Sequence, residues 1–355
     1  MDPRITKLAE ILTNYSIKIK EGDTIQINGG IESKDLVLEC YRKVLEKGAY
    51  PRTSISLPNQ SFIYYNTANE KQLRKLPKIA MFEAKNSDGF IGIWSTTNSR
   101  ELNSIDPKKV AMRSTAMRPL SDIRLKKDNW VGCGFPTMSA AQDADMSLEE
   151  FEDFVFNATN VDWQEQSKKQ DKLQNVLNKG SEVKILGKET ELTFSIKGLN
   201  GIKCDGHRNM PDGEVFTAPV PNSANGYIYY EFPAIYGGRE VSGVRLKFKD
   251  GQVVEATAEK NEKYLKEMIA MDKGSSFLGE FGIGVNYGIN QFIKSILFDE
   301  KIGGTIHLAL GNAYPECGKG VNKSALHWDM IKDLRNDGKF LIDDKIIQKN
   351  GKFLI

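Results

Sequence analysis

Hydrophobic positions recur with two different periods along the first half of the chain. Short apolar runs of strand length are separated by longer stretches in which apolar residues return every three or four positions. Ser33 is a candidate N-cap for the first long helical stretch, and Gly48 is a stop signal after it. Strands that alternate with helices favour an α/β domain with a largely parallel sheet. Predicted strands cover 23–29, 52–57, 88–95 and 129–136, and predicted helices cover 33–49, 69–85 with a break at Pro77, 107–126, 147–160 and 163–180.

The pattern changes near residue 181, where short β-rich segments become the main feature. One helical stretch, 258–271, interrupts them, and Lys249-Asp250-Gly251 is a good hairpin turn. We therefore expect an N-terminal α/β domain at 1–180 and a β-rich α+β domain at 181–355. Predicted strands of the second domain cover 182–187, 191–198, 225–232 and 243–258.

Charge and cysteine usage narrow the class of protein. The net charge of the 355-residue chain is +2 with acids and bases interleaved, which gives no reason to expect nucleic acid or a membrane as partner. No apolar run reaches the roughly 18 residues of a membrane-spanning helix. The four cysteines lie far apart without a CxxC pair, as is typical of reduced thiols, so we expect a cytoplasmic enzyme.

Several common catalytic motifs are absent from the sequence. Gly29-Gly30 follows a predicted strand, but no G-x-G-x-x-G is present, and neither a P-loop nor a G-x-S-x-G elbow occurs. Cys204 and His207 lie close together in CDGH, but a second ligand pair is lacking, and a solvent-facing loop is the better interpretation. Cys133 is interpreted as a small apolar residue on a buried strand.

Four short stretches in the second half place a metal-capable side chain opposite an apolar face. Strand alternation sets His307 of TIHLAL against Ile306, Leu308 and Leu310, and sets His327 and Asp329 of ALHWDM against Leu326, Trp328 and Met330. Glu280 of LGEFGIGV and Glu214 of DGEVFTAP point away from apolar neighbours in the same way. Imidazole and carboxylate together suit zinc, cobalt, manganese or iron.

Each of these stretches also has an interpretation without a metal. A histidine in a strand is often a hydrogen-bonded core residue, and Asp329 could cap a helix over 330–338. Taken together the four stretches favour a metal site, because a buried charge is costly without a partner or an ion.

Over these same residues the chain resembles the thermophilic aminopeptidase family, the M29 metallopeptidases. The similarity is carried by MPDGEVFTAP, FLGEFGIG, LFDEKIGGTIHLALGNAYP and NKSALHWDM, which follow one another in the family's order. The resemblance implies a homodimer with two divalent ions, zinc, cobalt, manganese or magnesium, in the C-terminal domain. Implied ligands are Glu214, Glu280 as the bridge, His307, His327 and Asp329, with Glu300 as a weaker candidate, and Glu280 and Tyr314 are implied as catalytic residues.

Three functions remain open from the sequence. The leading hypothesis is a metal-dependent aminopeptidase that uses a two-metal-activated water to remove the first residue of peptides with a free α-amine. The alternative is a mononuclear non-haem iron ring-cleaving dioxygenase of the same fold family, in which His307, His327 and Asp329 hold the iron. Glu214 and Glu280 favour the peptidase, because a one-metal site does not need them. A non-enzymatic protein with a structural metal is the third, and the carboxylate-rich set argues against it.

Overall fold

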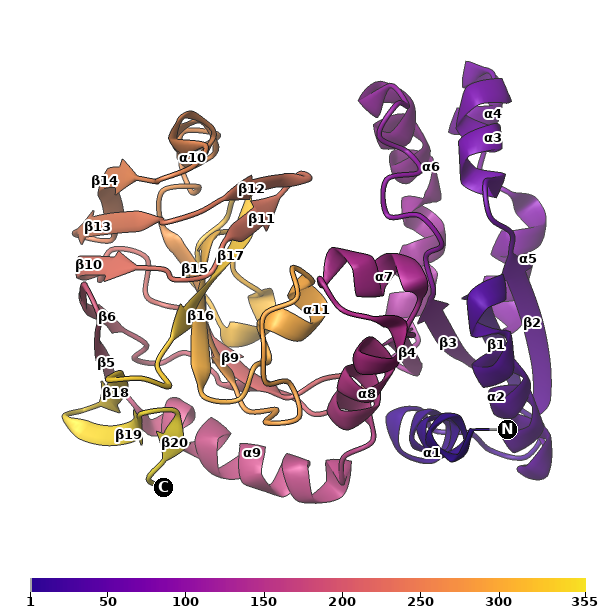
Figure 1. The fold of residues 1–355 in the computed structure, drawn as a ribbon, viewed down its shortest axis with the longest axis horizontal. Helices are drawn as coiled ribbons and strands as arrows, with labels where there is room; N and C mark the ends of the chain where they lie inside the picture. The colour runs from indigo at the N-terminus through magenta and orange to yellow at the C-terminus, as the bar shows by residue number, and fades with distance from the viewer. Residues whose placement is uncertain (1) are drawn as a thin grey trace. The chain divides into compact units, whose positions relative to one another are not determined.

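The computed structural model describes residues 2–355, which form two compact units (Figure 1). The first unit runs to Asn160 and includes Gly206–Pro211, and the second comprises Val161–Asp205 and Asp212–Ile355. These units differ from the expected ranges of 1–180 and 181–355 at helix α9 (Trp163–Lys179), which packs against strands of the second unit.

The first unit is built on a five-stranded sheet whose hydrogen-bonded neighbours are all parallel. The strand order is β2-β1-β3-β4-β8, so β2 lies on one side of β1 and the later strands lie on the other. The predicted α/β domain with a largely parallel sheet is therefore confirmed. The strands are β1 (Thr24–Gly30), β2 (Tyr50–Ser56), β3 (Gly89–Trp94), β4 (Trp130–Gly134) and β8 (Asn209–Met210).

The helices expected within 33–49, 69–85, 107–126 and 147–160 are present in this unit. Helix α2 (Lys34–Glu46) packs on β1 and β2, and the predicted break at Pro77 separates α4 (Glu70–Arg74) from α5 (Lys78–Asn86). The remaining helical segments are α1 (Pro3–Ile11), the π-helical turn η1 (Leu12–Ser16), η2 (Ile31–Ser33), α3 (Gln60–Thr67), α6 (Pro107–Lys126), α7 (Met138–Asp143) and α8 (Leu148–Thr159).

The second unit contains two larger antiparallel sheets and a small one, which confirms the β-rich C-terminal part. Its eight-stranded sheet has the order β14-β13-β10-β6-β5-β18-β19-β20, and its five-stranded sheet has the order β17-β16-β15-β9-β7. The eight strands are β5 (Glu182–Gly187), β6 (Thr190–Ser195), β10 (Asn225–Tyr229), β13 (Arg245–Lys249), β14 (Gln252–Thr257), β18 (Lys339–Ile342), β19 (Lys345–Lys349) and β20 (Lys352–Phe353).

The five-stranded sheet carries the stretches singled out in the sequence. It consists of β7 (Ile202–Cys204), β9 (Glu214–Thr217), β15 (Leu278–Gly284), β16 (Thr305–Gly311) and β17 (His327–Asp333). The other elements of the unit are α9, β11 (Ala234–Tyr236), β12 (Arg239–Val241), α10 (Glu262–Ile269), α11 (Ile296–Asp299) and η3 (Pro315–Cys317).

One hydrophobic core joins the two larger sheets of this unit. Phe281 of β15 packs edge-on against Phe194 of β6 and Phe340 of β18, at ring-centroid distances of 5.2 and 5.8 Å. The apolar faces expected opposite the four metal-capable stretches all belong to this core, including Val215, Phe281, Leu308 and Trp328. Burial of this face therefore fixes which side of the sheet the polar side chains occupy.

Two further expectations can be checked on the second unit. The hairpin turn at Lys249-Asp250-Gly251 is confirmed, because it joins the antiparallel strands β13 and β14. A helix after Asp329 is wrong, because β17 continues to Asp333 and pairs with β16 along its whole length. Across residues 2–355, no helix is both long and apolar enough to span a membrane.

Candidate metal centre

The candidate centre lies on the face of the five-stranded sheet opposite the hydrophobic core. In the antiparallel register Glu280 of β15 pairs with Ala309 of β16, and Ala309 pairs with Asp329 of β17. Further along β15, Gly282 pairs with His307 of β16, and Gly284 pairs with Glu214 of β9. Paired residues share a face, so four neighbouring strands direct carboxylates and an imidazole to one place. The small residues between them leave room for these longer side chains.

Five of the predicted ligands are brought together there. Nε2 of His307 lies 3.2 Å from Oε1 of Glu280 and 3.3 Å from Oε2 of Glu214. Nε2 of His327 lies 3.6 Å from Oε2 of Glu280 and 3.4 Å from Oδ2 of Asp329. Glu280 is thus the residue between the two halves of the cluster, one carboxylate oxygen facing each imidazole.

The orientation of the His327 ring is set by the backbone. Its Nδ1 lies 2.8 Å from the carbonyl oxygen of Asn312, which can only accept a hydrogen bond. Nδ1 therefore carries a proton, and Nε2 is the nitrogen that faces Glu280 and Asp329. A metal-binding histidine is commonly held in this way through its second nitrogen.

Crowding of buried carboxylates dominates the electrostatics of the cluster. Burial raises the pKa of Glu214 to about 8, although the nearby Lys301 ammonium opposes the shift, and burial raises the pKa of Glu280 as well. Burial alone would lower the pKa of both imidazoles, but the carboxylates beside them raise it to about 9 for His307 and to about 10 for His327. The neutral acids of Glu214 and Glu280 are thus favoured by burial, and their ionised forms need cationic compensation nearby.

The donor set fits divalent ions. Among the described residues, one buried oxygen each of Glu214, Glu280 and Asp329 has no hydrogen-bond partner, which is costly unless a cation binds it. Two overlapping groups, Glu214–Glu300–His307 and Glu280–His307–Asp329, each offer ligand atoms within 4.8 Å of one another. A mixed imidazole and carboxylate set of this kind accepts zinc, cobalt or manganese.

The two remaining sequence candidates lie at the edge of the cluster. The carboxylate of Glu300, which caps the C-terminal end of α11, accepts a hydrogen bond from Lys301. The Tyr314 ring contacts the rings of His327 and Phe216, each at a centroid distance of 5.3 Å, and 44% of the residue remains exposed. Partial burial and the carboxylates of Glu280 and Asp329 raise the pKa of the Tyr314 phenol, which keeps it protonated as a donor.

Lys301 is the functional candidate that sequence reasoning missed. Its side chain is fully buried, and its Nζ lies 3.5 Å from Oε1 of Glu214 and also bonds Glu300. Nothing in the local pattern distinguishes it from a surface lysine, because its burial depends on contacts with strands distant in the sequence. Asp212 was also missed, and it forms a third group of potential ligands with Cys204 and Glu214.

Cys204 and His207 belong to different compact units. The His207 ring stacks on Tyr15, and its Nδ1 lies 3.2 Å from the carbonyl oxygen of Ser16. Cys133 is fully buried on β4, as the sequence indicates.

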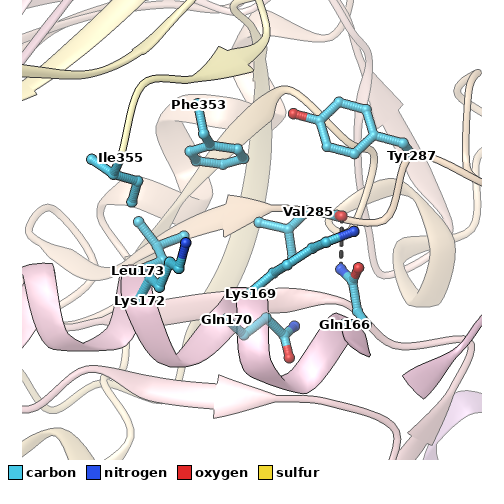
Figure 2. A pocket seen from close by; sticks show the side chains of 9 residues that line it. All are labelled: Gln166, Lys169, Gln170, Lys172, Leu173, Val285, Tyr287, Phe353 and Ile355. Carbon is cyan, nitrogen blue, oxygen red and sulfur yellow. Dashed lines mark hydrogen bonds between the residues drawn. The ribbon is translucent and has the colours of Figure 1, made fainter. Parts of the chain in front are cut away.

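A pocket of about 250 Å³ lies beside α9, and Figure 2 shows the side chains that line it, among them Gln166, Gln170 and Val285. Gln170 lines this pocket, and its amide donates to the carbonyl oxygens of Cys204 and Glu214 at 2.8 and 3.2 Å. Gln166 donates to the carbonyl oxygen of Val285 at 2.8 Å, which ties α9 to the end of β15. The side-chain amides of Gln170 and Gln166 thus fix the backbone at Glu214 and at Val285. None of the candidate metal ligands lines the pocket.

Comparisons with known proteins agree with this picture. The sequence profile of the family described as thermophilic metalloprotease (M29) matches residues 1–353. Aminopeptidase 2 of Geobacillus stearothermophilus is 26% identical, over 99% of this chain and 95% of its own length. The solved structure of wild-type AmpT from Thermus thermophilus has a TM-score of 0.85 at 22% identity and covers 99% of both chains. A 2,5-dihydroxypyridine dioxygenase from Pseudomonas putida KT2440 covers 98% of its chain and all of this one, with a TM-score of 0.63 at 13% identity. At these sequence identities, the similarity to the two solved structures shows a shared fold and nothing more.

Proposed function

Because the chain belongs to the M29 family of thermophilic metalloproteases, we propose that it uses two divalent ions to hydrolyse the first peptide bond of substrates with a free α-amine. Membership of this family confirms the resemblance found in the sequence. Together with the aminopeptidase relatives, it shows that the chain is a metallo-aminopeptidase. The observation that carries the two-ion proposal is the position of Glu280, whose two carboxylate oxygens face His307 and His327.

The proposed ligand set follows from these contacts. Glu214 and His307 would hold one ion, His327 and Asp329 the other, and Glu280 would bridge the two. Two divalent ions in such a site lower the pKa of a bound water and polarise the scissile carbonyl. Zinc, cobalt, manganese and magnesium are all candidates, since these ligands accept several divalent ions.

Side chains of the cluster would supply the remaining chemistry. The Tyr314 hydroxyl is a neutral donor beside His327, suited to stabilise the oxyanion that develops on the carbonyl oxygen. The proton released by the attacking water would pass through one of the carboxylates Glu214, Glu280 or Glu300 to the leaving amine.

The dioxygenase alternative rests on one structural neighbour and on the triad His307, His327 and Asp329. That neighbour shares the fold at 13% identity, whereas the family profile spans residues 1–353. Glu214 and Glu280 are buried in the same cluster and would be surplus in a one-iron site. A homodimer and a cytoplasmic location stay predictions from the sequence.

A paired hydrolysis assay tests the proposed activity. The protein is stripped with a chelator, resupplied with cobalt, zinc, manganese or magnesium, and offered a leucyl peptide with its N-terminus free or acetylated. We expect metal-dependent release of leucine from the free peptide and none from the acetylated one. Absence of release with every metal, together with oxygen uptake on dihydroxylated aromatic rings, would establish the alternative.

A further inference from the structure

Lys301 places a fixed positive charge inside the carboxylate cluster. It is fully buried, and its Nζ contacts both Glu214 and Glu300. These two carboxylates and His307 form one of the three groups that could hold an ion. The ammonium of Lys301 therefore interacts with the same carboxylates that a divalent ion would bind there.

The backbone holds Lys301 over this end of the site. Its carbonyl oxygen accepts a hydrogen bond from the backbone N–H of Asn286 at 3.1 Å, and the following residue, Ile302, forms a β-bridge with Asn286. The chain passes so close to β15 that a Cβ on Gly284 would lie 2.2 Å from the carbonyl oxygen of Ile302 and 2.9 Å from the carbonyl carbon of Lys301. The position of the lysine is thus built into the fold.

The other half of the site has a different set of contacts. His327 contacts both Asp329 and Glu280, and the ion pairs of Lys301 are with Glu214 and Glu300. A divalent ion that binds Glu214 has to share this carboxylate with the Lys301 ammonium or displace it. The ion and the ammonium repel each other, because both are positively charged. An ion on the Asp329 side does not have to displace these contacts.

We propose that Lys301 competes with the divalent ion on the Glu214–Glu300 side, so that the two ions bind with unequal affinity and the Asp329 side fills first. The inference rests on the proposed two-ion function. It identifies Lys301 as a positioning residue that sets how much metal the protein needs before both halves are loaded.

Calorimetric titration of the chelator-stripped protein with cobalt(II) tests the proposal. The wild type should show two binding steps, and Lys301→Met should strengthen the weaker step at least tenfold while leaving the stronger step within about threefold. Lys301→Arg keeps the charge and should retain the gap between the steps. Lys301→Gln supplies the same readout if the methionine variant fails to fold, which circular dichroism would show.

A second buried lysine provides the matched control. Lys332 is also fully buried, and its Nζ contacts Glu231 at 2.6 Å rather than the candidate ligands. Lys332→Met removes a buried ammonium of the same unit and should leave both cobalt affinities unchanged.

The titration distinguishes this inference from the proposed peptidase activity. An unchanged or weakened second step in both Lys301→Met and Lys301→Gln would overturn the proposal, as would a single bound ion in the wild type and both variants. If the predicted shift occurs in a protein that hydrolyses no peptide, the competition stands and the proposed activity fails.

Discussion

The imidazole of His307 lies directly over Gly282, its register partner on the neighbouring strand. A Cβ built on Gly282 would lie 1.9 Å from Nε2 and 2.0 Å from Cε1 of His307, closer than any real contact. The glycine thus gives the ring its place beside Glu214 and Glu280.

Gly282→Ala should therefore displace His307 and weaken metal binding. We expect the cobalt affinity of at least one site to fall tenfold or more, and peptidase activity at fixed metal to fall with it. Gly92→Ala on β3 is the matched control, because its nearest contact would be 3.9 Å from the new Cβ. Titration calorimetry on both variants provides the measurement, and unaltered binding in Gly282→Ala would contradict the described packing.

Glu280→Gln should abolish activity and lower the metal content. The substitution keeps the size of the side chain but removes the negative charge that lies between His307 and His327. Metal content is measured by elemental analysis after dialysis, alongside leucyl-peptide hydrolysis. Glu255→Gln, on the exposed strand β14, should alter neither quantity. Full metal content and full activity in Glu280→Gln would exclude its role as the bridge.

Tyr314→Phe should separate catalysis from metal binding. The ring would keep its contacts with His327 and Phe216, but the donor to the oxyanion would be lost. Removing one oxyanion donor lowers kcat by about 10²–10³-fold in other hydrolases. Steady-state kinetics and elemental analysis should show that loss with an unchanged metal content. Tyr227→Phe, at a half-exposed tyrosine, serves as control, and a kcat within threefold of wild type for Tyr314→Phe would rule out the role.

Phe281→Ala should destabilise the second unit without touching any candidate ligand. The ring is fully buried between Phe194 and Phe340, so its removal leaves a cavity between the two sheets. Such substitutions cost about 3–5 kcal/mol in free energy of unfolding. Urea unfolding followed by circular dichroism gives the comparison with Phe82→Ala, at an exposed ring of the first unit. A loss below ~1 kcal/mol would show that this contact contributes little.

Alternation along single strands predicted much of the candidate site. Glu280, His307 and Asp329 each lie opposite apolar residues, and burial of those residues in one core leaves the polar side chains on the other face. The pairing register of β15, β16 and β17 could not be predicted in this way, because 27 residues separate Glu280 from His307 and no short turn joins them.

Other features depend on contacts between distant parts of the chain. The burial of Lys301 follows from the path of its backbone across Gly284. Helix α9 has the periodicity of a surface helix, and only its packing on β7 and β9 assigns it to the second unit. Residues 330–333 alone are compatible with either a helix or a strand, and pairing with β16 makes them part of a strand.

Anomalous X-ray diffraction from cobalt-loaded crystals tests the central claim most directly. We predict two cobalt peaks within one cluster, one contacting Glu214 and His307, the other His327 and Asp329, with Glu280 contacting both. A single peak on His307, His327 and Asp329, or peaks away from these five residues, would contradict it.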